Sequence, residues 1–118
     1  MTLRSLQHAL AEFAADREWQ PFHTPKNLAM ALAGESGELL EIFQWLTPEQ
    51  SAQVMQNSER SQHVREEMAD VLAYLLRLAD VLDVDLEQAL ADKIEKNRRK
   101  YPVHLARGNA DKYTQLGG

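Results

Sequence analysis

The 118-residue chain has no cysteine, which excludes disulfides, thiolate catalysis and any zinc site built on cysteine. Glycine and proline are scarce, and no stretch alternates apolar and polar residues as a half-buried strand would. No apolar run reaches the length of a membrane span, and the N-terminus lacks the apolar stretch of a signal peptide. These absences predict a cytoplasmic, helical protein without a membrane partner.

Positive charge is also in deficit, since 13 Lys and Arg residues stand against 18 Asp and Glu residues. The formal net charge of -5 argues against nucleic acid as the main partner, because the phosphate backbone attracts basic surfaces. A small polyanion stays compatible with an acidic protein if metal ions bridge the two.

Apolar residues recur at helical spacing almost throughout the chain. Thr24-Pro25 is typical of an N-cap followed by proline, and predicts a helix from there to about Leu46. Thr47 with Gln50 predicts a capping box and a short helix. The other predicted helices cover about 3–13, about 61–82 and about 85–101.

We therefore expect one all-α domain over residues 1–118, with a four-helix bundle-like core and a short extra helix, assembled as an oligomer. Pro102 ends the last helix. The tail, residues 103–118, shows no periodicity and is expected to be extended or partly disordered.

Carboxylates interrupt the apolar faces of two predicted helices at matching places. Glu35 lies in the middle of one stripe, with Glu38 one turn later at its edge. Glu67 and Asp70 occupy the same positions on the helix over 61–82. The residues of the first stripe are Leu28, Leu32, Leu39, Ile42 and Leu46, and those of the second are Val64, Val71, Tyr74, Leu78 and Val81.

A carboxylate on a core-facing stripe must be neutral, paired or bound to metal. If the two helices pack antiparallel, the four side chains converge into an all-oxygen cluster, the ligand set that Mg²⁺ prefers. The alternative is neutralisation by Arg65, Arg77, Lys93 or Arg98. His63 precedes Glu67 by four residues but has no counterpart on the other helix, which disfavours a redox iron site.

Lys93, Asn97 and Lys100 run along the last helix beside its apolar stripe. Cations near a helix C-terminus complement the helix dipole, and a cationic row would also suit a substrate with several phosphates. Trp19 and Trp45 flank the glutamate-bearing helix, where they either pack in the core or stack on a base.

These motifs resemble the MazG-like all-α nucleotide pyrophosphohydrolases, and within them the dCTP pyrophosphatase branch. Two segments depart from the branch pattern: the stretch Leu46–Arg65, and Leu10, which stands where relatives can carry a polar pocket residue. The segments that carry the resemblance are Glu18–Leu28, Gly34–Leu39, Phe43–Trp45, Glu66–Leu75 and Lys93–Pro102.

The resemblance implies hydrolysis of a nucleoside triphosphate, with dCTP or a modified dCTP first, to monophosphate and pyrophosphate. It implies that Glu35, Glu38, Glu67 and Asp70 are catalytic and hold Mg²⁺, with Mn²⁺ as the substitute. The residues expected to bind substrate are Trp19, His23, Trp45, Tyr74, Lys93, Asn97 and Tyr101.

The helix over 61–82 also carries a second apolar set and is apolar nearly all round, which predicts burial against another copy. The resemblance points the same way, to a homotetramer with a dimer as the fallback. The rival functions are a non-catalytic helical interaction module with salt-bridged carboxylates, and a metal-binding helical bundle. The second apolar set is Met68, Leu72, Leu75, Leu76 and Ala79.

Overall fold

The computed structural model describes residues 1–108 and 110, and the described part contains helices and no strand. The all-α class expected from the sequence is therefore confirmed. The α-helices are α1 (Leu3–Asp16), α2 (Pro25–Phe43), α3 (Pro48–Ala52), α4 (Ser58–Leu82), α5 (Leu86–Lys100) and α6 (Val103–Ala106). Two short 3-10 turns, η1 (Gln20–Phe22) and η2 (Val54–Gln56), complete them. No helix among the described residues combines the length and apolar character needed to cross a bilayer.

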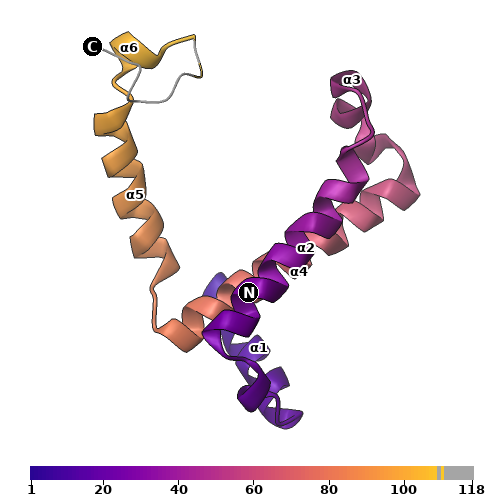
Figure 1. Ribbon diagram of the computed structural model, residues 1–118, viewed down its shortest axis with the longest axis vertical. Helices are drawn as coiled ribbons and strands as arrows, with labels where there is room; N and C mark the ends of the chain where they lie inside the picture. Colours follow the sequence, from indigo (N-terminus) through magenta and orange to yellow (C-terminus); the bar gives the residue numbers. More distant parts are fainter. Residues whose placement is uncertain (109, 111–118) are drawn as a thin grey trace. The chain divides into compact units, whose positions relative to one another are not determined.

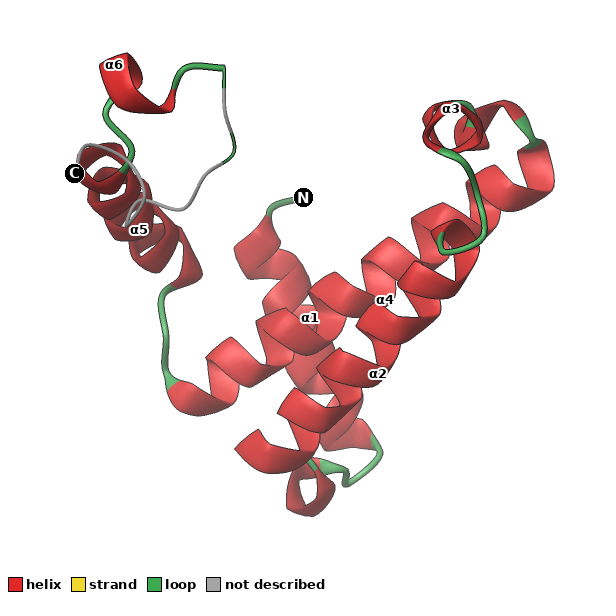
Figure 2. Ribbon diagram, turned by 45° about the horizontal axis from the view of Figure 1, so that its top comes forward, coloured by secondary structure: helices red, strands yellow, loops and turns green. Residues whose placement is uncertain are grey.

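The chain divides into two compact units, Met1–Asp83 and Val84–Gly118. In the first unit α2 and α4 lie side by side and run antiparallel, as Figures 1 and 2 show, and they form its most extensive helix contact. Helix α1 packs on α4, where the Gln7 side chain donates a hydrogen bond of 2.8 Å to the Leu76 carbonyl. The second unit contains α5 and α6.

Caps at helix ends fix where the helices begin. The Thr24 side chain accepts from the Asn27 N–H ahead of α2, and Thr47 forms a full capping box with Gln50 ahead of α3. Both caps were expected from the sequence. Helix α4 begins three residues earlier than expected, because Asn57 caps it by accepting from the Arg60 N–H. Helix α2 ends at Phe43 rather than near Leu46.

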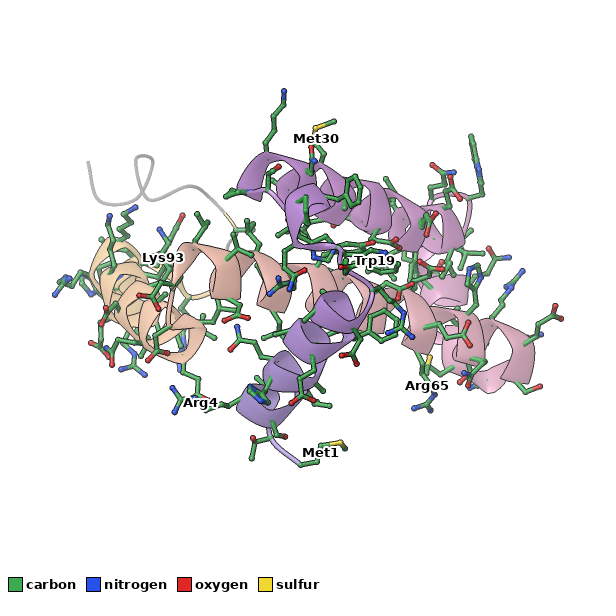
Figure 3. All side chains as sticks on the ribbon, turned by 90° about the horizontal axis from the view of Figure 1, so that it is seen from below. Met1, Arg4, Trp19, Met30, Arg65 and Lys93 are labelled. Carbon is green, nitrogen blue, oxygen red and sulfur yellow. The ribbon has the colours of Figure 1, made fainter. Side chains whose placement is uncertain are left out.

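The predicted stripes on α2 and α4 are buried in part: Val81 is exposed, and Leu46 lies beyond the end of α2. Leu28 is 2% exposed and Val64 is 5% exposed, and both begin the stripe of their helix. The second apolar set on α4 divides in two. Leu76 and Ala79 are buried, whereas Met68, Leu72 and Leu75 stay exposed. On α2, Met30 points away from α4 into solvent (Figure 3).

The tail differs from the extended segment expected from the sequence at Val103–Ala106, which forms the single-turn helix α6. Pro102 at its N-cap has an extended backbone, and its carbonyl accepts from the N–H groups of Leu105 and Ala106. A four-residue helix has no room for an apolar period, so periodicity could not indicate it. The expectation for residues 109 and 111–118 lies outside the described residues.

Candidate active site

Three glutamates meet between α2 and α4. One carboxylate oxygen from each of Glu35, Glu38 and Glu67 lies within 4.8 Å of the other two, and we call this group the carboxylate cluster. Glu35 and Glu67 are partly buried because each sits within the apolar stripe of its helix, whereas Glu38 is exposed at the edge. Helices α2 and α4 lie side by side (Figure 2), and this antiparallel packing brings the two motifs together.

The cluster contains unsatisfied buried oxygens. Glu35 Oε2 and Glu67 Oε2 are both shielded from solvent and have no hydrogen-bond partner. Buried polar atoms in folded proteins are nearly always satisfied, and an unpaired buried carboxylate is costly. A cation with oxygen ligands would satisfy both atoms, and an all-oxygen donor set suits Mg²⁺ or a similar hard ion.

Burial, together with the crowding of negative charge, raises the pKa values of Glu35 and Glu67 in the protein without metal. Burial raises the pKa of Glu35 from 4.5 to about 7, and its interactions with Glu38, Asp70 and Glu67 add to this. Burial, Glu38 and Asp70 likewise raise the pKa of Glu67, while His63 opposes the shift. A bound cation would act in the opposite direction by favouring the ionised carboxylates.

Asp70, the fourth expected ligand, is near the cluster but outside its tightest group. Its charge contributes to the raised pKa of both Glu35 and Glu67. It also lines a cavity between α1 and α4, described below. Asp70 thus stands where the carboxylate cluster and the cavity meet.

The arginines that could have neutralised the cluster contact other groups. Arg65 donates to the Ser61 hydroxyl, Arg77 to His23 and Asp80, and Arg98 pairs with Glu95. The imidazole of His63 is the basic group beside the cluster, with its Nε2 3.4 Å from Glu67 Oε1. Among the described residues, no Lys or Arg ion pair reaches the three glutamates.

A cavity of about 170 Å³, partly open to solvent, lies beside Asp70, and we call it the aromatic cavity. Its apolar walls are Leu10, Phe13, Ala14, Trp19 and Ala73. Its polar lining residues are His23, Asp70, Tyr74 and Arg77.

The turn after α1 places Trp19 in the lining of this cavity. Glu18 adopts a left-handed backbone with φ of 55°, and the Trp19 N–H then donates to the Ala14 carbonyl. The indole contacts Phe13 and His23 edge-on, with ring centroids 5.6 Å and 6.0 Å away. These contacts hold Trp19 partly exposed at the wall, where a flat ligand can stack on it.

The polar side of the cavity is organised by Arg77. Its Nε donates to His23 Nδ1 at 3.1 Å, and its Nη1 donates to Asp80 Oδ2 at 3.1 Å. Burial and the neighbouring Arg77 charge lower the pKa of His23, so its imidazole stays neutral at neutral pH.

The expected site residues are distributed over four places: the carboxylate cluster, the aromatic cavity, the exposed position of Trp45 and helix α5 with its C-cap. The first unit brings Glu35, Glu38 and Glu67 together and places Trp19, His23, Asp70 and Tyr74 at the adjoining cavity. Trp45 is 85% exposed and does not line the cavity. The residues expected to contact phosphate belong to the second unit: Lys93 and Asn97 lie on α5, and Tyr101 caps it.

Arg77 was expected at most as a counter-ion, and its place in the cavity was missed. The sequence does indicate that Arg77 shares a helix face with the other cavity residues of α4, since Asp70, Ala73, Tyr74 and Arg77 follow the spacing i, i+3, i+4, i+7. Its contact with His23, 54 positions away, depends on the loop before α2 and has no counterpart in helical periodicity.

A family model described as the MazG-like family matches residues 32–116. The chain belongs to the MazG-like family. The MazG-like match includes the whole carboxylate cluster and Asp70, whereas α1 and Trp19 precede it.

Individual relatives of this MazG-like protein extend the similarity over nearly the whole chain. It is 48% identical to dCTP pyrophosphatase 1 of Bos taurus over 115 residues, which is 98% of this chain and 68% of the relative. It is 49% identical to dCTP pyrophosphatase 1 of Homo sapiens over 116 residues, with the same coverage. The crystal structure of a pyrophosphatase from Archaeoglobus fulgidus DSM 4304 is similar with a TM-score of 0.78 and 46% identity, covering 84% of this chain and 91% of that one.

Proposed function

We propose that this chain hydrolyses a deoxynucleoside triphosphate, with dCTP or a modified dCTP as the first candidate, to the monophosphate and pyrophosphate. The broader assignment, that the protein is a nucleoside triphosphate pyrophosphohydrolase, rests on its membership of the MazG-like family. It also rests on relatives named dCTP pyrophosphatase 1, whose sequences are 48% and 49% identical to this one. The observation that carries the proposal is the pair of buried, unpartnered oxygens in the carboxylate cluster. Such an activity would clear unwanted triphosphates from the cytoplasmic pool.

In this proposal Glu35, Glu38, Glu67 and Asp70 hold Mg²⁺, with Mn²⁺ as the substitute. The cluster geometry supports the first three as ligands, and the proximity of Asp70 supports the fourth. When bound, Mg²⁺ would supply the positive charge that offsets the triphosphate and stabilises the departing pyrophosphate.

The chain's own groups orient the reactants. A carboxylate oxygen that is not a metal ligand orients a water molecule against the α-phosphorus and accepts its proton. A new phosphorus–oxygen bond forms, the bond from the α-phosphorus to the bridging oxygen breaks, and pyrophosphate leaves. Lys93, Asn97 and Tyr101 are assigned to the phosphates because the family resemblance implies it, and Lys93 would supply positive charge to the leaving pyrophosphate.

The nucleoside is assigned to the aromatic cavity. Trp19 offers an indole for stacking, and His23 and Tyr74 offer polar groups next to it. Asp70 lines the same cavity and adjoins the cluster, so one molecule can place its base in the cavity and its phosphates at the carboxylates. Trp45 is assigned to the same substrate only in the assembled enzyme, because in the single chain it is exposed.

We propose a homotetramer, with a dimer as the fallback, in which the helices form a four-helix core. Met68 is 57% exposed, and Leu72 and Leu75 lie exposed on the same helix. Clustered exposed apolar side chains favour burial against a partner, and a second copy is the simplest partner. Tyr74 or the tail would then contribute to a neighbouring copy's pocket.

A nucleotide panel with product analysis by ³¹P NMR tests the activity. The expected products from dCTP are dCMP and pyrophosphate, formed only when a divalent cation is present. A diphosphate plus orthophosphate would place the attack at the γ-phosphorus and refute the proposal. Absence of turnover across the panel would favour a non-catalytic helical module or a metal-binding bundle instead.

A further inference from the structure

One charged side chain in the aromatic cavity has no role in the function proposed above. Arg77 is 12% exposed at its side chain, although an arginine is usually kept in water. Two partners fix its position, His23 through Nε and Asp80 through Nη1. They come from different elements, the segment ahead of α2 and the last turns of α4, so the guanidinium is held from two sides.

The two contacts leave part of the guanidinium available. A guanidinium has five N–H donors and no acceptor. The contacts to His23 and Asp80 use one N–H on Nε and one on Nη1. The second N–H of Nη1 and both N–H groups of Nη2 are not engaged by any described residue.

His23 adds a further donor to the cavity because of its hydrogen bond with Arg77. Its Nδ1 accepts from Arg77, so a neutral imidazole must carry its proton on Nε2. The lowered pKa of His23 agrees with the neutral form. The Arg77–His23 pair therefore presents only donors to anything that enters the cavity.

The rest of the cavity limits what enters. Leu10, Phe13 and Trp19 form apolar and aromatic walls, which suit a flat ring better than a hydrated phosphate. A cavity of about 150 Å³ accepts benzene, so 170 Å³ accommodates one six-membered ring. The ring must carry an acceptor toward Arg77, and the acceptor shared by cytosine, uracil and thymine is the carbonyl O2. Adenine carries no carbonyl oxygen.

Resting on the proposed function, we propose that Arg77 is a specificity-determining residue that donates to the carbonyl O2 of a pyrimidine base, with His23 holding the guanidinium in position. The enzyme then selects pyrimidine nucleotides through an oxygen rather than through the exocyclic amino group of cytosine. Asp80 acts on the opposite side of the guanidinium as a positioning residue.

The test combines a substrate change with a residue change. In 2-thio-dCTP a sulfur replaces O2, and sulfur is a weak acceptor. We expect the unmodified enzyme to show KM for 2-thio-dCTP about 10- to 100-fold above that for dCTP, since a charge-assisted hydrogen bond is lost. In Arg77→Met the two KM values should be equal, and discrimination against dATP should fall. Arg65→Met is the matched control, because Arg65 is on the same helix but points away from the helix pair (Figure 3).

Two further measurements keep the outcomes separate. If Arg77→Met is unstable, Arg77→Lys replaces it in the test. Lysine keeps the charge and most of the bulk but lacks the planar guanidinium, so this variant should fold and lose the O2 preference. Titration of dCMP and 2-thio-dCMP by calorimetry measures the same preference without turnover. Pyrophosphate release with no O2 preference in the unmodified enzyme would overturn the role of Arg77 alone. An O2 preference in binding with no pyrophosphate release would instead overturn the proposed reaction.

Discussion

The carboxylate cluster, which α4 shares with α2, and the Arg77 guanidinium, which α4 carries alone, are charged groups with opposite surroundings. In the carboxylate cluster, two buried oxygens of Glu35 and Glu67 lack any partner. About three turns after Glu67, Arg77 is equally buried, with its side chain 12% exposed against 13% for Glu67, but it is bound on both sides by His23 and Asp80. Among the described residues, the cluster has only the His63 imidazole beside Glu67 and no Lys or Arg partner, whereas Arg77 has the Asp80 carboxylate.

This difference separates a site that must be completed from a site that is already built. Burial and the neighbouring carboxylates raise the pKa values of Glu35 and Glu67, which favours their protonated forms, whereas a bound cation favours the ionised forms. A braced guanidinium keeps its charge and geometry before any ligand arrives, which lowers the cost of ordering it on binding. The cluster should therefore depend on an added ion, whereas the aromatic cavity should bind its ligand ring without one.

The largest effect is expected at the cluster. Glu38→Gln keeps the shape of the side chain but removes a charge, so hydrolysis should fall more than about 100-fold while the helix content stays the same. Glu41→Gln on the same helix is the matched control, because Glu41 is exposed and outside the cluster. Steady-state pyrophosphate release and circular dichroism measure the two quantities. Equal activity in both variants would mean that the cluster is not the reaction centre.

Assembly tests the same comparison, because a Lys or Arg side chain from a neighbouring copy would give the carboxylate cluster the counter-charge that it lacks in the single chain. Leu72→Glu places a charge on the exposed apolar face of α4 and should convert tetramers or dimers to monomers. Leu3→Glu makes the same change at an exposed leucine of α1 and serves as the control. Light scattering at micromolar concentration gives the mass of each. A fully active unmodified protein at 13.4 kDa would contradict the assembly proposal.

Alanine substitution of Trp19 and of Trp45 should have different effects on nucleotide binding. Trp19→Ala removes a wall of the aromatic cavity and should weaken nucleotide binding by about 1–3 kcal/mol, seen as a raised KM. Trp45→Ala should weaken binding only in the assembled enzyme, because Trp45 is exposed in the single chain. The comparison is made in the Leu72→Glu background. A Trp45 effect that persists in the monomer would place that indole at the same chain's substrate.

The smallest expected effect is on stability, and it sharpens the claim about unpaired carboxylates. Folding raises the pKa of Glu35 from 4.5 to about 7, so the folded chain binds this proton more tightly than the unfolded chain. The contribution of this proton to the free energy of unfolding is fully present below about pH 4.5 and is lost as the pH rises toward about 7. Without metal, Glu35→Gln should lose less stability than the unmodified protein across this window. Thermal unfolding at several pH values measures it, and parallel pH profiles would argue against the raised pKa.

Local signals made much of the fold predictable. Thr47 and Gln50 predict the capping box of α3, and Asp85 with Gln88 predicts the start of α5, because a helix cap depends on residues three positions apart. The start of α4 was placed too late, since its first turn is polar and has no apolar period. The position of Glu35 and Glu67 on the buried faces followed from helical spacing alone.

The details that sequence reasoning could not give are those that depend on tertiary contacts or on a helix end. Trp45 lies beyond Phe43, where α2 ends, so its angle on an extended helical wheel does not describe its position. The contact from Arg77 to His23 depends on how the loop before α2 folds back. Neither the wheel nor the motif spacing contains that information.

Divalent ion binding tests the central claim most directly, namely that the unpaired oxygens of Glu35 and Glu67 are ligands of a cation. Mn²⁺ added to the protein without nucleotide loses its free-ion electron paramagnetic resonance signal when it binds, so the signal counts bound ions. We expect at least one Mn²⁺ per chain, displaced by Mg²⁺, and loss of this binding in Glu35→Gln and in Glu67→Gln but not in Glu41→Gln. Equal Mn²⁺ binding by all four proteins, or none by the unmodified protein at millimolar Mn²⁺, would contradict it.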